Sequence, residues 1–242
     1  MKNLDALFLE RLQEEIGVRF HDLRVLQRAL THRSYLNENR NVIEHNELLE
    51  FLGDAALEWV VTHYLFRRYG DENEGTLTNI RAKIVNGVTL FLVAEKLGLA
   101  EHLRVSRGGQ NELENPRSRS RLLANTLEAV IGAIAVDRGL GTAELFIIEY
   151  LLPLCDEVVQ KRAYYDPKSY LQELVQERLK ETPLYRVLDE QGLDHARVFT
   201  IGCYVGTRML AKASGASKGE AETAAARTAL KEEFRVELPG VL

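Results

Sequence analysis

Three acidic residues, Glu47, Glu50 and Asp54, occur within residues 45–54. If this stretch is helical, Glu50 and Asp54 project from one face and Glu47 lies beside them, because residues three and four apart are neighbours on a helix. Like charges in this arrangement repel each other, and burying them among the apolar residues of the same stretch would cost still more free energy. The pattern therefore predicts a site for a hard divalent cation, and such sites carry out phosphate chemistry.

A second pair of oxygen ligands supports this interpretation. Asn125 and Glu128 share a face of another predicted helix, whose other residues are mostly Leu, Ala, Val, Ile and Gly. Two apolar helices that each present paired oxygen ligands are typical of magnesium and manganese sites in helical bundles. The alternative is that each pair belongs to a solvated helix face. No metal-ligand spacing is shown by the histidines His32, His45, His63 and His102.

The elements that must position these residues are helices. Apolar residues recur at three- and four-residue spacing over residues 4–159, which predicts an all-helical region. The predicted helices cover residues 7–16, 22–31, 48–69, 76–97, 121–137 and 142–160.

Residues 106–120 interrupt this pattern. They include Gly108-Gly109 and Asn115-Pro116 and almost no apolar side chains, so we expect an exposed loop there. The stretch is locally basic, because it contains Arg107, Arg117 and Arg119, with Arg121 just beyond. Such arginines are either solvated or in contact with phosphates.

The pattern changes again near residues 161–167, where Asp166-Pro167 signals a turn. A helix over 168–180, strands over 184–188, 197–204 and 208–213, and an Ala-rich helix over 218–234 are then predicted. This order is typical of an independent α+β module. The expected fold is an all-α domain over residues 1–160, followed by a small α-β-β-β-α domain over residues 166–235.

Composition sets weaker limits. The formal net charge of −5 argues against a nucleic-acid partner, but residues 1–160 hold 18 Lys and Arg against 24 Asp and Glu, whereas residues 161–242 hold 13 against 12. Global charge is therefore a poor guide to the partner. Cys155 and Cys203 suggest neither a disulfide framework nor a zinc site. No secretion signal is visible and the apolar stretch 85–94 is too short to span a bilayer, so we expect a cytoplasmic protein with no membrane partner.

The run NELLEFLGDAAL at residues 46–57 resembles the signature of the bacterial ribonuclease III family. Three further pieces of that family's pattern fit in the right order: ALTHRSY at 29–35 upstream, and DENEGTLT at 71–78 and LANTLEAVIGAI at 123–134 downstream. The resemblance extends over nearly the whole chain.

The resemblance implies roles for individual residues. The positions of the family's metal ligands are Glu50, Asp54, Asn125 and Glu128. Asp54 and Glu128 are implied to be indispensable for catalysis, and Glu47 and Glu74 match acids near the scissile phosphate. Phe51 matches an aromatic residue that enters a pocket of the partner subunit in a homodimer, although an ordinary core phenylalanine is the alternative.

Two departures from the family pattern concern this region. Asn125 stands where the family usually has Asp; its amide oxygen can still bind magnesium but brings no negative charge, so we expect weaker metal binding rather than loss of activity. Leu48 replaces a usual Arg, which is expected to remove a structural ion pair. The carboxylates of Glu50, Asp54 and Glu128 are intact.

A second resemblance covers the C-terminal module, where DPKSYLQELVQE at 166–177 is similar to the opening of a double-stranded RNA-binding domain. Hydroxyl and amide groups on its polar face suit recognition of 2′-hydroxyls in the minor groove. The run GLDHARVF at 192–199 matches a minor-groove loop with Phe199 in the core, and SKGEAE at 217–222 matches a helix start that meets phosphates. The implied RNA-binding residues are Ser169, Gln172, Gln176, His195, Ser217 and Lys218. Gly219 and Ala213 replace a usual Lys and Gly, so we expect weaker RNA binding.

The implied activity is cleavage of double-stranded RNA by a homodimer that uses magnesium, for which manganese can substitute. The products would carry 5′-phosphate ends and short 3′ overhangs, and ribosomal RNA and other transcripts would be processed. A bound magnesium ion would activate water and neutralise charge on the phosphate. One alternative is a double-stranded RNA-binding protein of the same fold that no longer cleaves. Another is a helical phosphohydrolase that acts on small molecules.

Overall fold

The computed structural model describes residues 2–160, 165–192 and 197–238. The chain divides into two compact units, Met1–Glu157 and Val158–Leu242.

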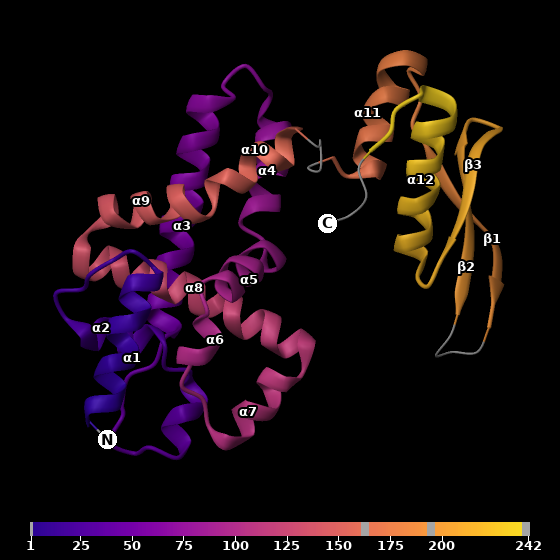
Figure 1. The fold of residues 1–242 in the computed structure, drawn as a ribbon. Coiled ribbons are helices and arrows are strands. Elements are labelled where there is room, and N and C mark those ends of the chain that lie inside the picture. The colour runs from indigo at the N-terminus through magenta and orange to yellow at the C-terminus, as the bar shows by residue number, and fades with distance from the viewer. Residues whose placement is uncertain (1, 161–164, 193–196, 239–242) are drawn as a thin grey trace. The chain divides into compact units, whose positions relative to one another are not determined.

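Helices make up the first unit, and the two longest, α3 and α8, form its centre (Figure 1). The elements are α1 (Lys2–Glu15), α2 (Leu23–Ala29), the short 3-10 helix η1 (Arg33–Asn37), α3 (Glu47–Arg68), α4 (Glu74–Ile84), α5 (Gly87–Lys96), α6 (Leu99–His102), α7 (Arg107–Glu114), α8 (Pro116–Arg138), α9 (Leu140–Tyr150) and α10 (Leu152–Gln160). The long run Leu122–Ile134 of α8 is almost wholly buried, with Asn125 and Glu128 as its partly exposed members. This burial explains why α8 is apolar on nearly every side.

Helices α3 and α8 touch through their backbones at two glycines. A Cβ atom at Gly53 would lie 1.8 Å from the backbone oxygen of Glu128, and one at Gly132 would lie 2.0 Å from the backbone oxygen of Leu49. Real Cβ atoms do not approach so closely, so a side chain at either glycine would push the helices apart. The absence of side chains here brings the acidic faces of the two helices together.

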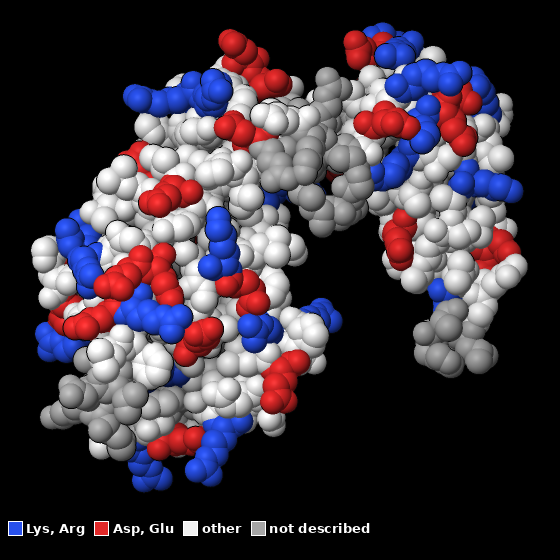
Figure 2. Space-filling view, in the orientation of Figure 1, with Lys and Arg blue, Asp and Glu red and all other residues white. Residues whose placement is uncertain are grey.

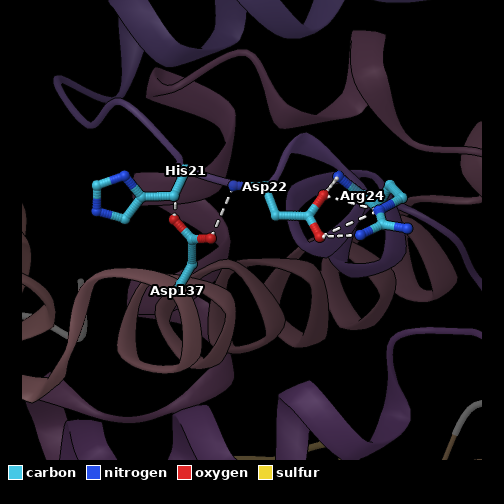
Figure 3. A network of polar contacts seen from close by, with 4 residues as sticks. All are labelled: His21, Asp22, Arg24 and Asp137. Carbon is cyan, nitrogen blue, oxygen red and sulfur yellow. Dashed lines mark hydrogen bonds and ion pairs between the residues drawn. The ribbon is translucent and has the colours of Figure 1, made fainter.

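The C-terminal end of α8 is tied to the start of α2 (Figure 3). The Asp137 carboxylate accepts hydrogen bonds from the backbone N–H groups of His21, at 2.7 Å, and Asp22, at 2.9 Å. Asp22 in turn caps α2, because its carboxylate accepts from the backbone N–H of Arg24. This chain of contacts fixes the loop before α2 on the central helix.

The prediction of an exposed loop over residues 106–120 is wrong. Residues 107–114 form α7, and α8 begins at Pro116. Capping decides this, because Ser106 accepts from the backbone N–H of Gly109, and Asn115 accepts from those of Arg117 and Ser118. Proline at the first helical position adds to the signal.

Two long predicted helices are each divided in two. Residues 76–97 form α4 and α5, with Asn86 capping α5 through the backbone N–H of Thr89. Residues 142–160 form α9 and α10, which meet at Leu151. No single helix in the described ranges is long and apolar enough to cross a membrane; α4 and α5 together pass that test but are bent by 42° at their junction.

The second unit has the predicted order, helix, three strands, helix. Its elements are α11 (Pro167–Leu179), β1 (Leu184–Gln191), β2 (Val198–Val205), β3 (Arg208–Gly215) and α12 (Lys218–Phe234). The strands form one antiparallel sheet in the order β1-β2-β3, and both helices cover the same face of it (Figure 1). The core between them includes Leu171 and Val175 of α11, Cys203 of β2, and Ala225 and Leu230 of α12. The expected fold class is confirmed in both units.

Candidate active site

The α3–α8 crossing brings together the residues that sequence spacing selected as metal ligands. The side-chain amide of Asn125, on α8, donates a hydrogen bond through Nδ2 to Oε1 of Glu50, on α3, at 2.7 Å. Glu50, Asn125 and Glu128 are partly buried, whereas Asp54 is exposed. Because Gly53 lies against the backbone of Glu128, the flanking Asp54 stands beside that acid. The residues Glu50, Asp54, Asn125 and Glu128 are called the acid cluster below.

The carboxylates of the acid cluster repel one another. The pKa of Glu128 is raised to about 7. Burial is the largest cause, and the negative charges of Asp54 and Glu50 add to it. Burial also raises the pKa of Glu50, with added repulsion from Glu47 and Asp54. Among the described residues, no Lys, Arg or His forms an ion pair with the three carboxylates of the cluster. The cluster therefore has excess negative charge that only a cation would balance.

The donor set of the acid cluster fits a hard divalent cation. Three carboxylates and one amide oxygen are ligands that magnesium and manganese accept, and unpaired half-buried acids favour a bound cation. In the described parts of the chain, no three Asp, Glu, His or Cys side chains lie close enough together to hold a metal ion, and the Asn125 amide presents its nitrogen to Glu50. Carboxylates with no cation between them separate by mutual repulsion.

The raised pKa of Glu128 predicts a pH effect on stability without divalent ions. An acid whose folded pKa lies above its unfolded value, here about 7 against 4.5, adds stability that is full below pH 4.5 and is lost as the pH rises through about 7. With EDTA present, the parent should therefore lose stability as the pH rises from 5 to 8, whereas Glu128→Gln should not. The free energy of unfolding of the variant relative to that of the parent should increase by about 2 kcal/mol over this range. Urea unfolding at both pH values measures this. An equal difference between parent and variant at both would contradict the electrostatic account.

The two acids expected near the scissile phosphate lie differently. Glu47 begins α3, is exposed, and pairs with Arg33 at 3.3 Å. Its charge is close enough to raise the pKa of Glu50, so it borders the acid cluster. Glu74 begins α4 and is also exposed, and the described contacts do not join it to the cluster.

Helix α3 also carries an exposed apolar stripe, of which the sequence pointed only to Phe51. Phe51 is 77% exposed, so it is not a core phenylalanine. Trp59 and Phe66, which are 61% and 70% exposed, follow it at helical spacing. Leu48 and Leu52 extend the stripe toward the start of the helix. Contiguous exposed apolar residues of this size mark a surface that another molecule covers.

In the second unit, those predicted RNA-binding side chains that the structure describes are solvent-exposed. Ser169, Gln172 and Gln176 lie on the outer face of α11, whose Leu171, Leu174 and Val175 are buried against the sheet. Ser217 caps α12 by accepting from the backbone N–H of Glu220, and Lys218 is its first residue. His195 lies outside the described residues.

The prediction that Phe199 belongs to the core of the second unit needs correction. Its ring is only partly buried, and the Lys218 ammonium lies 5.6 Å from the ring centre. A cation over an aromatic face is attracted to it. Phe199 therefore supports the side chain of Lys218 at the start of α12.

These features define a class of protein in which a helical domain with a half-buried acid cluster is joined to an α-β-β-β-α module. Known proteins agree with this description. A family model described as Ribonuclease-III-like matches residues 22–154, and one described as the double-stranded RNA binding motif matches residues 167–233. The chain therefore belongs to the ribonuclease III family: it is an endoribonuclease that carries a double-stranded RNA-binding motif. The family is generally metal-dependent.

Individual relatives support this assignment over most of the chain. Ribonuclease 3 of Syntrophomonas wolfei is 43% identical over 223 residues, which cover 92% of this chain and 94% of the relative. Ribonuclease 3 of Bdellovibrio bacteriovorus is 40% identical over 225 residues, covering 93% and 95%. A crystal structure of the nuclease domain of ribonuclease III from Campylobacter jejuni matches with a TM-score of 0.54 and 33% identity, covering 59% of this chain and 95% of that domain.

Proposed function

We propose that this chain cleaves double-stranded RNA in a magnesium-dependent reaction, with manganese as a substitute, and leaves 5′-phosphate ends with short 3′ overhangs. The observation that carries the proposal is the unbalanced acid cluster at the α3–α8 crossing, in a chain that also carries the double-stranded RNA-binding motif. Its substrates are precursors of ribosomal RNA and other transcripts in the cytoplasm.

In this proposal the acid cluster holds the cation. The carboxylates of Glu50, Asp54 and Glu128 and the amide oxygen of Asn125 are its ligands, and Asp54 and Glu128 are the catalytic residues. When bound, magnesium supplies an activated water and balances the charge that develops on the phosphate. Glu47 and Glu74 are the acids that lie near the scissile phosphate in this proposal; both are exposed, so RNA can reach them.

The second unit selects the substrate. Hydroxyl and amide groups of Ser169, Gln172 and Gln176 are exposed on one helix face, where they can reach the 2′-hydroxyls of a shallow minor groove. Ser217 and Lys218, at the N-terminus of α12, contact phosphates, since a helix N-terminus attracts anions. His195 enters a second minor groove. Contacts with 2′-hydroxyls make the protein specific for RNA over DNA.

The experiment that tests this proposal combines the purified full chain with a long RNA duplex in EDTA, magnesium or manganese. Cleavage in either metal, none in EDTA, and none of a DNA duplex of the same sequence are expected. Binding without cleavage in every condition would leave the alternative, a double-stranded RNA-binding protein that does not cleave. Deletion of residues 161–242 should lower activity; an unchanged rate on small phosphate esters would favour a small-molecule phosphohydrolase instead.

We also propose that the chain is a homodimer joined along the apolar stripe of α3. The nuclease domain from Campylobacter jejuni has a region involved in dimer formation. A two-fold dimer presents one acid cluster to each strand of a duplex, which explains cleavage of both strands. Phe51, the most exposed aromatic of the stripe, inserts into the partner subunit.

Phe51→Arg should therefore weaken dimerisation by about 100-fold, because a buried aromatic side chain contributes roughly 3 kcal/mol or more to an interface. Analytical ultracentrifugation over a concentration series measures this. Val88→Arg is the matched control, since Val88 is an exposed apolar residue on α5, outside the stripe. If both variants dimerise like the parent, Phe51 does not lie in the interface.

Asn125→Asp should lower the magnesium concentration needed for half-maximal cleavage, by about threefold to tenfold, because a fourth carboxylate strengthens cation binding. The same change replaces the Nδ2 donor to Glu50 with a repelling oxygen, so the metal-free protein should become less stable. Magnesium titrations followed by cleavage and by thermal unfolding test both effects. Unchanged curves in both would show that Asn125 is not a metal ligand.

A further inference from the structure

The basic stretch before the acid cluster has two arginines whose side chains form no ion pair with any residue that the structure describes. Arg119 forms an ion pair with Glu95, at 2.7 Å, and so contributes to folding. Arg117 and Arg121 are exposed, and among the residues that the structure describes neither forms an ion pair. Their guanidinium groups are therefore available to a ligand.

Both arginines share a face of α8 with the acid cluster. Arg117, Arg121 and Asn125 are four positions apart, and Glu128 follows three positions later, so all four project from one side of the helix. Arg117, Arg121 and Asn125 lie about 6 Å apart in succession along the helix axis, at roughly 1.5 Å per residue. This spacing is close to that of neighbouring phosphates along one RNA strand. The arginines thus form a line that ends at the acid cluster.

Helix stability does not explain this placement. The partial positive charge at a helix N-terminus favours acids and disfavours cations, by about 0.3–1 kcal/mol each. Yet α8 has no acidic residue in its first turn, and Arg117 occupies that turn. The N-terminal part of α8 is therefore more positive than folding requires, which is the arrangement that attracts an anion.

The acid cluster makes such cations necessary for an RNA substrate. Its three carboxylates repel the phosphates that must approach it, and each phosphate neutralised by an arginine offsets part of that repulsion. Acidic and basic side chains are interspersed over the visible face of the first unit (Figure 2), so no broad basic surface on that face supplies the attraction.

We propose that Arg117 and Arg121 bind consecutive phosphates of the RNA strand and guide it along α8 into the acid cluster. This inference rests on the proposed cleavage of double-stranded RNA. Both side chains contact the substrate but not the scissile bond, so they act on substrate binding rather than on the chemical step.

The test is the double variant Arg117→Ala with Arg121→Ala, measured as the full chain on an RNA duplex over a range of salt concentrations. We expect KM to rise about tenfold, with kcat within about twofold of the parent. The slope of log(kcat/KM) against log salt should become shallower by roughly one for each lost arginine. The double change to Lys should keep the salt slope, because the charge remains.

Arg67→Ala is the matched control, since Arg67 is exposed in the last turn of α3, far from the acid cluster along the helix, and forms no ion pair with a described residue. It should cleave like the parent. The inference is overturned if the double alanine variant keeps the parent's KM and salt slope, or if Arg67→Ala weakens cleavage equally. If the double alanine variant does not fold, the double variant Arg117→Gln with Arg121→Gln is measured in its place. Failure of the unaltered chain to cut RNA would instead overturn the proposed function.

Discussion

Glu128→Gln is expected to abolish cleavage of double-stranded RNA and to leave RNA binding intact or tighter. The change keeps the size of the side chain but removes the most buried negative charge of the acid cluster. Loss of one charged ligand from a catalytic metal site costs about 4 kcal/mol of transition-state stabilisation, which is roughly a thousandfold in rate. Binding should not suffer, since a repelling carboxylate has been removed. Single-turnover cleavage and gel-shift titrations on the same duplex measure the two effects separately.

The matched control for this prediction is Glu149→Gln. Glu149 is an exposed acid on α9, outside the acid cluster, so its neutralisation should leave both cleavage and binding unchanged. A Glu128→Gln variant that still cuts at a tenth of the parental rate would exclude Glu128 as an essential ligand. Loss of RNA binding together with cleavage would point to a structural role instead.

The helical periods of the sequence predicted much of the site. Glu50 and Asp54 share a face because α3 is a regular helix, and Asn125 and Glu128 share one because α8 is. The contact between the two pairs depends on tertiary packing, yet the apolar character of both segments indicated that the two helices would pack together. The direct bond between Asn125 and Glu50 joins the two pairs.

Other features had no local signal strong enough to predict them. Helix α7 is mostly polar and contains two glycines, so it has almost no apolar residues to mark it as a helix. The capping residues Ser106, at its start, and Asn115, at the start of α8, are the signals that reveal the two helices. The apolar stripe of α3 resembles core sequence, because periodicity cannot distinguish a face buried within a subunit from one covered by another molecule. Exposure of Phe51 and Trp59 appears only in the folded chain.

A large loss of stability is expected from a substitution at Gly53, where α3 and α8 are in direct backbone contact. Gly53→Ala should destabilise the first unit by about 3 kcal/mol or more, because the new Cβ would lie 1.8 Å from the backbone oxygen of Glu128. Backbone cannot rotate away as a side chain can, so the helices must separate. For a domain of this size, such a loss lowers the unfolding temperature by roughly 6–12 °C.

Gly141→Ala separates this steric effect from the general effect of adding a methyl group. Gly141 lies in the first turn of α9 and a Cβ there would meet nothing within 4 Å, so alanine should be neutral or stabilising by up to about 1 kcal/mol. Thermal and urea unfolding of both variants provide the comparison. Because the displaced atom belongs to Glu128 itself, Gly53→Ala should also lose most cleavage under conditions where it remains folded. A folded Gly53→Ala protein with parental activity would mean that the acid cluster tolerates a wider helix separation than the close contact at Gly53 implies.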